Sequence, residues 1–254
     1  MNATRPSARA RTLGTTMALA AALAFAMTGG LGAQGITQQQ AEEMLKELRA
    51  IRQALERVTP PAPTGPAQDQ RAKLDSVSGY SLGRTDAPLT LVEFTDLQCQ
   101  FCYRFSTAVF GQLKAAYIDT GKVRFVTRDF PLDFHPYALP AARAARCAGE
   151  QGKFWEMRMS LVSAYNRLNA AFVTFTAEGL KLDMAAFNAC TASTRFDAAI
   201  MQDMNEGRAV NVEGTPTFVL GRTTAQGLDG IVMVGAQPFA AFDAKIKELL
   251  AQPR

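Results

Sequence analysis

The sequence predicts an α/β fold in which a strand–helix–strand unit is followed by a long helical insertion and a return to strands. Three observations lead to this prediction. The apolar run Leu89–Thr95 leads into the stretch Cys99–Cys102, which opens a helical pattern. The stretch 135–208 is rich in alanine and has apolar residues at helical spacing. Residues 212–220 and 231–235 then have the composition of strands.

The composition excludes several classes of protein. The chain has 254 residues, 48% of them hydrophobic and 20% charged, which is ordinary for a globular protein. Its formal charge of +4 includes Arg5, Arg9 and Arg11 in a predicted leader, and removal of those three leaves +1. With so small a charge and no basic stripe interleaved with aromatic residues, no nucleic-acid partner is expected. One histidine in the whole chain excludes a His-rich metal site.

Residues 1–33 have the pattern of an export signal. Three arginines precede an apolar stretch from Met17 to Met27, and small residues follow up to Ala33, where cleavage is expected. The dense apolar part has about 11 residues, short of the roughly 20 that span a membrane, so an uncleaved anchor is the weaker alternative. Export predicts the periplasm, an oxidising compartment in which cysteines form disulfides.

Residues 34–58 carry a heptad pattern. The seam has apolar residues at spacings of 3 and 4, typical of a coiled coil; its members are Ala41, Met44, Leu48, Ile51, Leu55 and Val58. We expect a homo-oligomer of two or three copies joined through residues 37–58, the alternative being one amphipathic helix lying on the domain. The Pro-rich stretch 59–70 is predicted to be an extended linker.

The remaining residues, 71–254, are predicted to form the catalytic domain. Its expected elements, in chain order, are an edge strand at 77–80, a strand at 89–95, a helix at 101–118, a strand at 122–127, the helical insertion at 135–208, a strand ending at 220, a hairpin loop at 221–230, a strand at 231–235 and a helix at 239–250.

The stretch Cys99-Gln100-Phe101-Cys102 places two thiols one helical turn apart at the start of a helix. The free N–H groups and partial positive charge of a helix N-terminus stabilise a thiolate, the form of cysteine that attacks a disulfide. Cys99 is nearer the helix start and water, so we expect it to be the attacking sulfur. Neither Gln100 nor Phe101 is charged, so the pKa of Cys99 should fall below about 8.5, but less than in the strongest oxidants. The alternative is a structural disulfide.

Four other positions have predicted roles. Cys147 and Cys190 lie on separate predicted helices, and we expect a structural disulfide between them rather than two buried thiols. His135 precedes a proline at a turn and is expected to start a helix or join the core, away from the two active-site cysteines. Asp96 is expected at the surface near the helix start.

Several motifs together resemble the DsbA-like branch of the thioredoxin superfamily over about residues 73–250. These motifs are Asp86-Ala87-Pro88, Val92–Cys102, Arg128–Leu132 with His135-Pro136, Cys147-Ala148 with Gly152–Trp155, and Val212–Phe218. The heptad helix lies outside this match. It is similar to the oligomerising stalks of disulfide isomerases and of the suppressor-of-copper-sensitivity proteins.

The resemblance implies a thioredoxin-like fold with an inserted helical subdomain. It implies that Pro216 follows a cis peptide bond and faces the two cysteines, and that the Thr215 backbone binds substrate. It places Glu93 as a buried acid under the active site that relays a proton to or from Cys102; the alternative for Glu93 is a salt-bridged strand residue.

The implied function is a thiol–disulfide oxidoreductase that forms, reduces or isomerises disulfide bonds in exported proteins, without a cofactor and with a membrane redox partner. Gly-Thr-Pro at 214–216 resembles reductases and isomerases more than the strongest oxidants. The alternative function is a copper(I)-binding or holdase protein that uses the reduced cysteines, since soft thiolates select copper(I).

Overall fold

The computed structural model describes residues 37–58 and 70–252 of the chain. The chain divides into two compact units, residues 1–66 and 67–254, each described by itself here. The predicted signal peptide and all but the last residue of the predicted linker lie outside the described residues. Within the described part, no helix is both long and apolar enough to cross a membrane.

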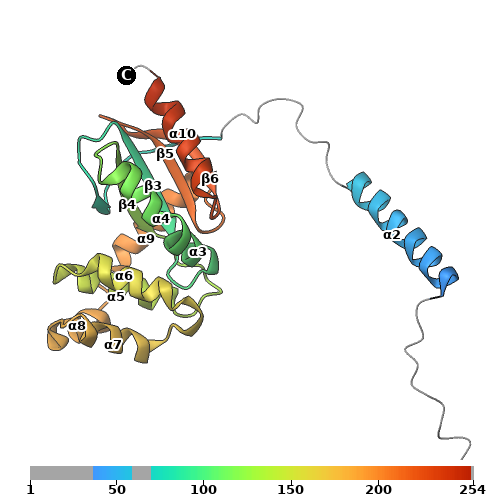
Figure 1. The fold of residues 1–254 in the computed structure, drawn as a ribbon. Coiled ribbons are helices and arrows are strands. Elements are labelled where there is room, and N and C mark those ends of the chain that lie inside the picture. Colours follow the sequence, from blue (N-terminus) through green and yellow to red (C-terminus); the bar gives the residue numbers. More distant parts are fainter. Residues whose placement is uncertain (1–36, 59–69, 253–254) are drawn as a thin grey trace, which may run out of the picture. The chain divides into compact units, whose positions relative to one another are not determined.

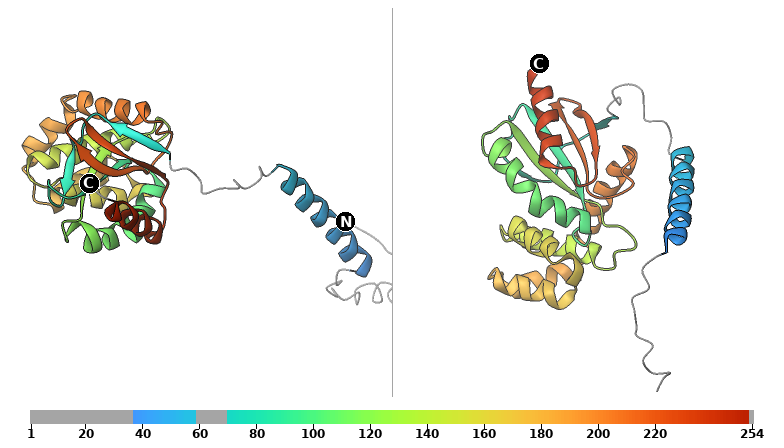
Figure 2. Two further views of the ribbon diagram at one scale, coloured as in Figure 1. Left: turned by 90° about the horizontal axis from the view of Figure 1, so that it is seen from above. Right: turned by 45° about the vertical axis from the view of Figure 1, so that its right-hand side comes forward.

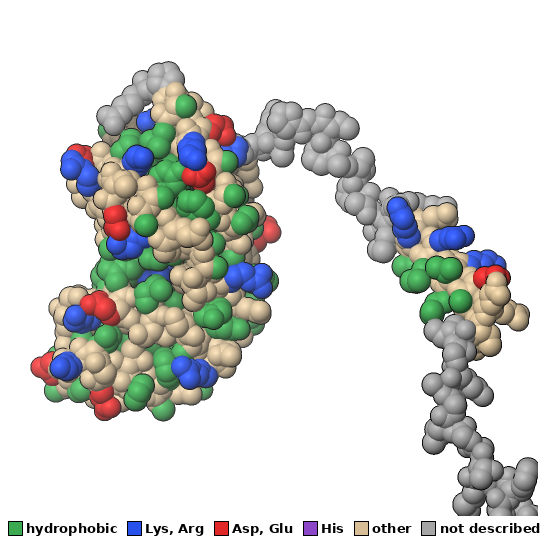
Figure 3. Space-filling view, in the orientation of Figure 1, with side chains coloured by type: hydrophobic (Ala, Val, Ile, Leu, Met, Phe, Trp, Pro, Cys, Tyr) green, Lys and Arg blue, Asp and Glu red, His purple; other side chains and the backbone are tan. Residues whose placement is uncertain are grey.

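The heptad segment forms one helix, α2 (Gln38–Val58). It begins with a capping box, in which the Gln40 amide donates to Thr37 Oγ1 and the Thr37 amide donates to Gln40 Oε1. Met44, Leu48 and Ile51 are each about half exposed, at 52%, 55% and 53%. Hydrophobic side chains follow one side of this helix, and lysine and arginine side chains lie apart from them (Figure 3).

The second unit is built on a six-stranded mixed sheet (Figure 1). The strand order is β1-β6-β5-β3-β4-β2, in which β3 and β4 are parallel and the other neighbours are antiparallel. The strands are β1 (Arg71–Leu74), β2 (Tyr80–Leu82), β3 (Leu89–Thr95), β4 (Val123–Asp129), β5 (Thr217–Thr224) and β6 (Gly227–Val234). This fold confirms the α/β prediction, and β3 occupies the predicted range.

Strand β3 lies between β5 and β4, and both of its faces are buried along its whole length. Side chains of a strand alternate between faces, so Leu89, Leu91 and Glu93 point one way and Val92 and Phe94 the other. The first face packs under one set of helices: α3 (Gln100–Ala108), α4 (Phe110–Leu113), the π-helix Lys114–Ile118 and α10 (Phe239–Ala251). The second face packs against α9 (Asp197–Ala209).

Four helices form a layer at one end of the sheet, separate from the helices that cover its faces (Figures 1 and 2). They are α5 (Ala138–Glu150), α6 (Phe154–Ser163), α7 (Ala170–Gly179) and α8 (Met184–Ala192). Buried alanines on α5 let its neighbours approach closely, and the core of this layer includes Cys99 and Cys102. The helical insertion therefore forms one wall of the region around these two cysteines.

The predicted hairpin loop at 221–230 is wrong. Strand β5 continues to Thr224 and β6 starts at Gly227, so the turn is short. Gly221 and Gly230 face each other in the ladder. A Cβ on Gly221 would lie 2.0 Å from the Asp229 carbonyl oxygen, so this glycine permits a close approach of two strands rather than a loop.

Two other boundaries differ from the prediction. The edge strand lies at Tyr80–Leu82 rather than 77–80, and the sequence pattern missed β1, which pairs with β6. The predicted helix 101–118 is interrupted at Val109. The φ of Val109 is −119°, far from the helical value of about −63°, whereas its ψ of −44° is helical. It then continues through α4 into the π-helix. Gly111 follows the break by two residues.

Candidate active site

The two cysteines of the CxxC stretch lie where β3 passes into α3. Cys99 is the N-cap residue of α3 and Cys102 lies within its first turn. Both are free thiols. We expected Cys99 to lie nearer water than Cys102. Cys99 does come first along the helix, but its exposed fraction is only 4%, and Cys102 is fully buried. The helix places both sulfurs toward the layer formed by the insertion.

The surroundings push the pKa values of the two thiols apart. The pKa of Cys99 falls from 9.0 to about 6, first because the Cys102 thiol donates a hydrogen bond to it, and further through the backbone amides of Phe101 and Cys102. The pKa of Cys102 is raised well above its usual range, mainly by burial, and the nearby charge of Glu93 acts in the same direction. At neutral pH Cys99 is therefore a thiolate and Cys102 a protonated thiol.

The turn that contains Pro216 lies against Cys99. The peptide bond between Thr215 and Pro216 is cis. When protonated, the Cys99 thiol donates to the Thr215 carbonyl oxygen, with 3.3 Å between sulfur and oxygen. The Thr217 hydroxyl donates to the Gly214 carbonyl at 2.7 Å across the same turn. A backbone segment thus lies beside the Cys99 sulfur.

Glu93 lies under the two cysteines and is completely buried. Arg158 of α6 donates to its Oε2 at 2.5 Å, and the Thr127 hydroxyl donates to the same oxygen at 3.3 Å. Burial raises the pKa of Glu93, and the positive charge of Arg158 opposes that rise. The Oε1 atom is buried without a hydrogen-bond partner. Glu93 is therefore a buried acid, as predicted, and it also forms the ion pair that the alternative prediction described.

The sequence interpretation did not identify Arg158. Its side chain is 1% exposed and its guanidinium lies 5.8 Å from the ring centre of Trp155. The available signal was an arginine between Met157 and Met159 on the apolar helix α6. Since arginine is almost never fully buried without a partner, that pattern indicates a buried carboxylate nearby.

The structure corrects the expectations for Asp96 and His135. Asp96 is 2% exposed rather than at the surface. Its carboxylate accepts hydrogen bonds from the amides of Gln98 and Leu132, at 2.7 and 2.9 Å, and meets His135 Nδ1 at 2.8 Å. His135 is not remote from the active site, since it lines the same groove as Cys99. The turn after β4 folds back over the start of α3, and sequence spacing does not show this.

The groove beside Cys99 has a volume of about 380 Å³ and is largely apolar. Two phenylalanines on its rim, Phe101 and Phe134, are 51% and 73% exposed. The lining residues are Cys99, Gln100, Phe101, Leu132, Phe134, His135, Glu213, Gly214 and Thr215. Exposed aromatic rings around a reactive sulfur are suited to hold a peptide segment.

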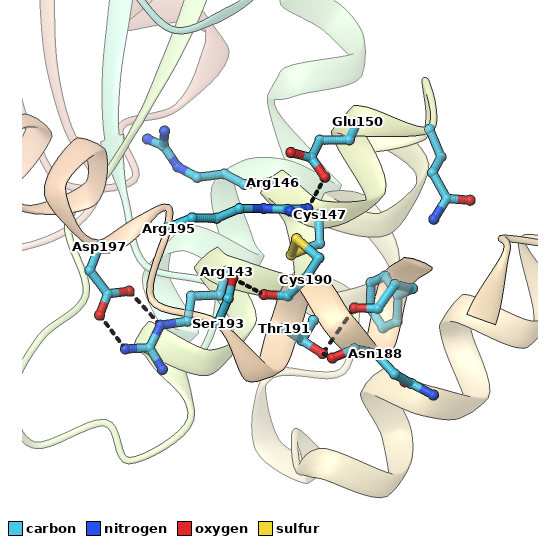
Figure 4. Close-up of a disulfide and its surroundings, with 12 residues drawn as sticks. Arg143, Arg146, Cys147, Glu150, Asn188, Cys190, Thr191, Ser193, Arg195 and Asp197 are labelled. Atoms are coloured by element: carbon cyan, nitrogen blue, oxygen red, sulfur yellow. Dashed lines mark hydrogen bonds and ion pairs between the residues drawn. A yellow bond between two sulfur atoms is a disulfide. The ribbon is translucent and has the colours of Figure 1, made fainter. Parts of the chain in front are cut away.

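Cys147 of α5 and Cys190 of α8 are joined by a disulfide, with 5.8 Å between their Cα atoms. Ion pairs between Arg143 and Asp197 and between Arg195 and Glu150 lie on the two sides of this bridge (Figure 4). The disulfide therefore links two helices of the insertion to each other.

In the described part of the chain, no three histidine, cysteine, aspartate or glutamate side chains are placed to hold one metal ion. In the groove, the Cys99 thiolate is the soft donor.

Comparison with known proteins agrees with this geometry. Residues 75–231 match the family model described as Thioredoxin. This chain belongs to the thioredoxin family. Wolbachia pipientis alpha-DsbA1 is 23% identical, with a TM-score of 0.60 over 73% of this chain and 92% of that chain. BdbD from Bacillus subtilis is 21% identical, with a TM-score of 0.61 over 73% of this chain and 100% of that chain. These two likenesses confirm the DsbA-like thioredoxin fold.

Two further comparisons concern another solved structure and a relative by sequence. A thioredoxin-like oxidoreductase from Silicibacter pomeroyi DSS-3 is 25% identical, with a TM-score of 0.58 over 68% of this chain and 93% of that chain. The Na(+)/H(+) antiporter NhaA 3 of Salinispora tropica is 35% identical over 175 residues, which are 68% of this chain and 26% of the antiporter. The chain thus spans about a quarter of the length of the curated relatives it matches, and the antiporter activity is not transferred to it.

Proposed function

We propose that this protein is a thiol–disulfide oxidoreductase of exported proteins that uses Cys99 and Cys102. The observation that carries the proposal is the difference between the two thiols: Cys99, which lines the groove, has a pKa of about 6, whereas Cys102 is fully buried and has a raised pKa. A low pKa at the sulfur that lines the groove and a high pKa at the other sulfur assign the attack to Cys99 and the resolving step to Cys102.

In the oxidising direction, a substrate thiolate attacks the Cys99 sulfur of a Cys99–Cys102 disulfide. A mixed disulfide with Cys99 forms, and Cys102 leaves and takes up a proton. A second substrate thiolate then attacks the mixed disulfide, which releases the oxidised substrate and leaves the enzyme reduced. In reduction or isomerisation the Cys99 thiolate attacks a substrate disulfide first, and Cys102 resolves the mixed disulfide.

The turn at Thr215-Pro216 and the apolar groove form the proposed substrate site. An extended substrate segment would pair with the Thr215 backbone next to the Cys99 sulfur, while Phe101 and Phe134 would cover its apolar side chains. The periplasm is the proposed compartment, because the leader has the pattern of an export signal and the chemistry needs an oxidising environment. A membrane protein would then restore the redox state of the enzyme.

Glu93 is the proposed proton carrier for Cys102. Its burial and raised pKa support this role, and its negative charge already raises the pKa of Cys102. The unpartnered Oε1 atom leaves one oxygen available for a proton while Oε2 is held by Arg158. Arg158 would limit how readily Glu93 becomes protonated.

The test is a pair of substitutions assayed on a reduced peptide and on insulin. Cys99→Ala should abolish both peptide oxidation and insulin reduction, whereas Cys102→Ala should accumulate the mixed disulfide because the resolving thiol is gone. Activity that survives in Cys99→Ala would refute the proposal. The reduction potential then gives the direction, since about −120 mV indicates an oxidant and about −270 mV a reductase. The Cys99 pKa of about 6 leads us to expect a value between these two.

We also propose that residues 37–58 join copies of this chain in parallel. The exposed Met44, Leu48 and Ile51 supply a seam whose burial would be favourable. In that register Glu47 occupies a g position and Arg52 the following e position, so a parallel pair places opposite charges together across the seam. Paired active sites would suit isomerisation, in which a substrate exchanges several disulfides.

Light scattering of the mature chain tests the assembly. Leu48→Asp should give monomers because it buries a charge in the seam, while Glu43→Gln, outside the seam, should leave the assembly intact. A monomeric native chain, or an unchanged assembly of Leu48→Asp, would contradict the proposal.

A further inference from the structure

We propose that His135, oriented by Asp96, accepts the proton of the substrate thiol that attacks Cys99. The inference rests on the proposed thiol–disulfide exchange and adds a second functional group to its site. His135 has side-chain exposure of 21%, whereas the Asp96 side chain is fully buried. The pair lies at the edge of the groove that contains Cys99.

The hydrogen bonds of Asp96 determine the tautomer of His135. Two backbone amides, of Gln98 and Leu132, donate to the carboxylate of Asp96. A carboxylate only accepts hydrogen bonds, so the 2.8 Å contact with His135 requires the proton to be on Nδ1. In the neutral ring Nε2 then carries a lone pair and can accept a proton.

His135 lines the groove that contains Cys99 and also a neighbouring depression with Leu139 and Met204. The Nδ1 edge faces the buried Asp96, so the exposed edge of the ring is the one that contains Nε2. The Phe134 ring packs edge-on against the imidazole at 4.5 Å between ring centres and holds it on the groove wall. The other titratable groups that share the depressions around His135 are Cys99, Asp133 and Glu213.

The step begins with a proton transfer. The substrate thiol gives its proton to Nε2, which produces a thiolate and an imidazolium. The thiolate forms a bond to Cys99 Sγ, the Cys99–Cys102 bond breaks, and Cys102 departs with the electron pair. The substrate sulfur and Cys99 are then joined in the mixed disulfide. His135 then gives its proton to solvent or to the Cys99 thiolate, which leaves when the second substrate thiolate attacks the mixed disulfide.

This role predicts a defined dependence on pH. Above about pH 8.5 an ordinary substrate thiol is already ionised and needs no base. His135 therefore accelerates exchange mainly below that pH.

The first experiment compares His135→Gln with the native chain in stopped-flow oxidation of a cysteine peptide. We expect a rate about 100-fold lower near pH 7.5, with the two rates converging near pH 9.5. With thionitrobenzoate, a thiol already ionised at neutral pH, the variant should react as fast as the native chain. Tyr137→Phe, on the same turn and outside the groove, is the matched control and should behave as the native chain does.

The second experiment needs no variant. Because the chain has one histidine, nitrogen NMR of the untagged native protein reports His135 alone, and it should show the Nδ1-protonated tautomer. A predominantly Nε2-protonated ring would overturn the inference. A rate loss in His135→Gln that is equal at every pH, or equal for thionitrobenzoate, would also overturn it. Those outcomes leave the proposed function intact, since that function fails only if Cys99→Ala remains active.

Discussion

At the scale of single residues, the hydrogen bond between the two active-site thiols has the largest effect on the pKa of Cys99. It is the first cause of the lowered pKa of Cys99, ahead of the backbone amides at the helix start. The sequence predicted the lowering and attributed it to the helix terminus, because a contact between the two side chains depends on their rotamers. Asp96 and His135 were misplaced for a similar reason: they meet only after the turn folds back.

Substitution of Cys102 tests this order of causes. Cys102→Ala removes the donor and should raise the pKa of Cys99 from about 6 toward 9.0. Cys102→Ser keeps a hydroxyl donor and should hold the pKa nearer to 6 than the alanine variant does. The ultraviolet absorbance of the thiolate, followed through a pH titration, measures both. Equal pKa values in the two variants would show that the helix terminus dominates instead.

The Glu93–Arg158 pair should respond asymmetrically to substitution. Glu93→Gln leaves the buried Arg158 without an anion and should lower the free energy of unfolding by about 3 kcal/mol. The double variant Glu93→Leu with Arg158→Met removes both charges, and we expect it to recover most of that loss. Denaturant unfolding of the native chain, of the single variants Glu93→Leu and Arg158→Met and of the double variant gives the coupling energy. Additive effects of the two single variants in the double variant would contradict a direct pair.

At the scale of elements, periodicity located the strands and helices better than it located their ends. Strand β3 was predicted residue for residue because all of its positions except Thr95 are apolar or lie between apolar neighbours. The β5–β6 turn was misplaced because glycine was interpreted as a turn signal, although Gly221 and Gly230 serve strand contact. The break at Val109 lies two residues before Gly111, and the packing of Phe105 and Phe110 in the core accompanies it.

The disulfide of the insertion should contribute strongly to stability. It closes a stretch with a sequence separation of 43, for which loop-closure entropy gives about 4 kcal/mol. Cys147→Ala with Cys190→Ala should lower the free energy of unfolding by about that amount in a denaturant titration. The thiolate titration of Cys99 should keep its midpoint, because neither Cys147 nor Cys190 lines the groove. A changed midpoint would show that the bridge also shapes the active site.

At the scale of the whole molecule, a buried ion network joins the sheet to the helices. Arg128 of β4 contacts Asp203 of α9, and Arg146 of α5 contacts both Asp129 and Asp203. The Arg128 side chain is fully buried and also donates to the Ser76 carbonyl. The family resemblance anticipated the overall architecture, but these contacts join residues 17 to 75 positions apart and no local pattern indicates them.

Asp203 makes stability depend on pH in an unusual direction. Burial, followed by the charge of Asp129, raises the pKa of Asp203 from 3.8 to about 6. The folded chain therefore binds this proton more tightly than the unfolded chain, and the resulting stabilisation is complete below pH 3.8 and lost as the pH rises through about 6. The difference in unfolding free energy between the native chain and Asp203→Asn should fall by about 3 kcal/mol over that range.

Thermal or denaturant unfolding at a series of pH values measures this difference. The asparagine variant does not titrate at this position, so it serves as the reference for the other carboxylates. A difference that increases with pH would show that the arginines, rather than burial, control Asp203.

The contact between Arg158 and Glu93 also constrains how such a chain can change during evolution. The cation comes from the inserted helices and the anion from the central strand. A lineage that shortened the insertion would lose the counter-ion of an acid at the centre of its fold. Substitutions at positions 93 and 158 should therefore occur together among relatives, and the insertion should persist wherever the acid does.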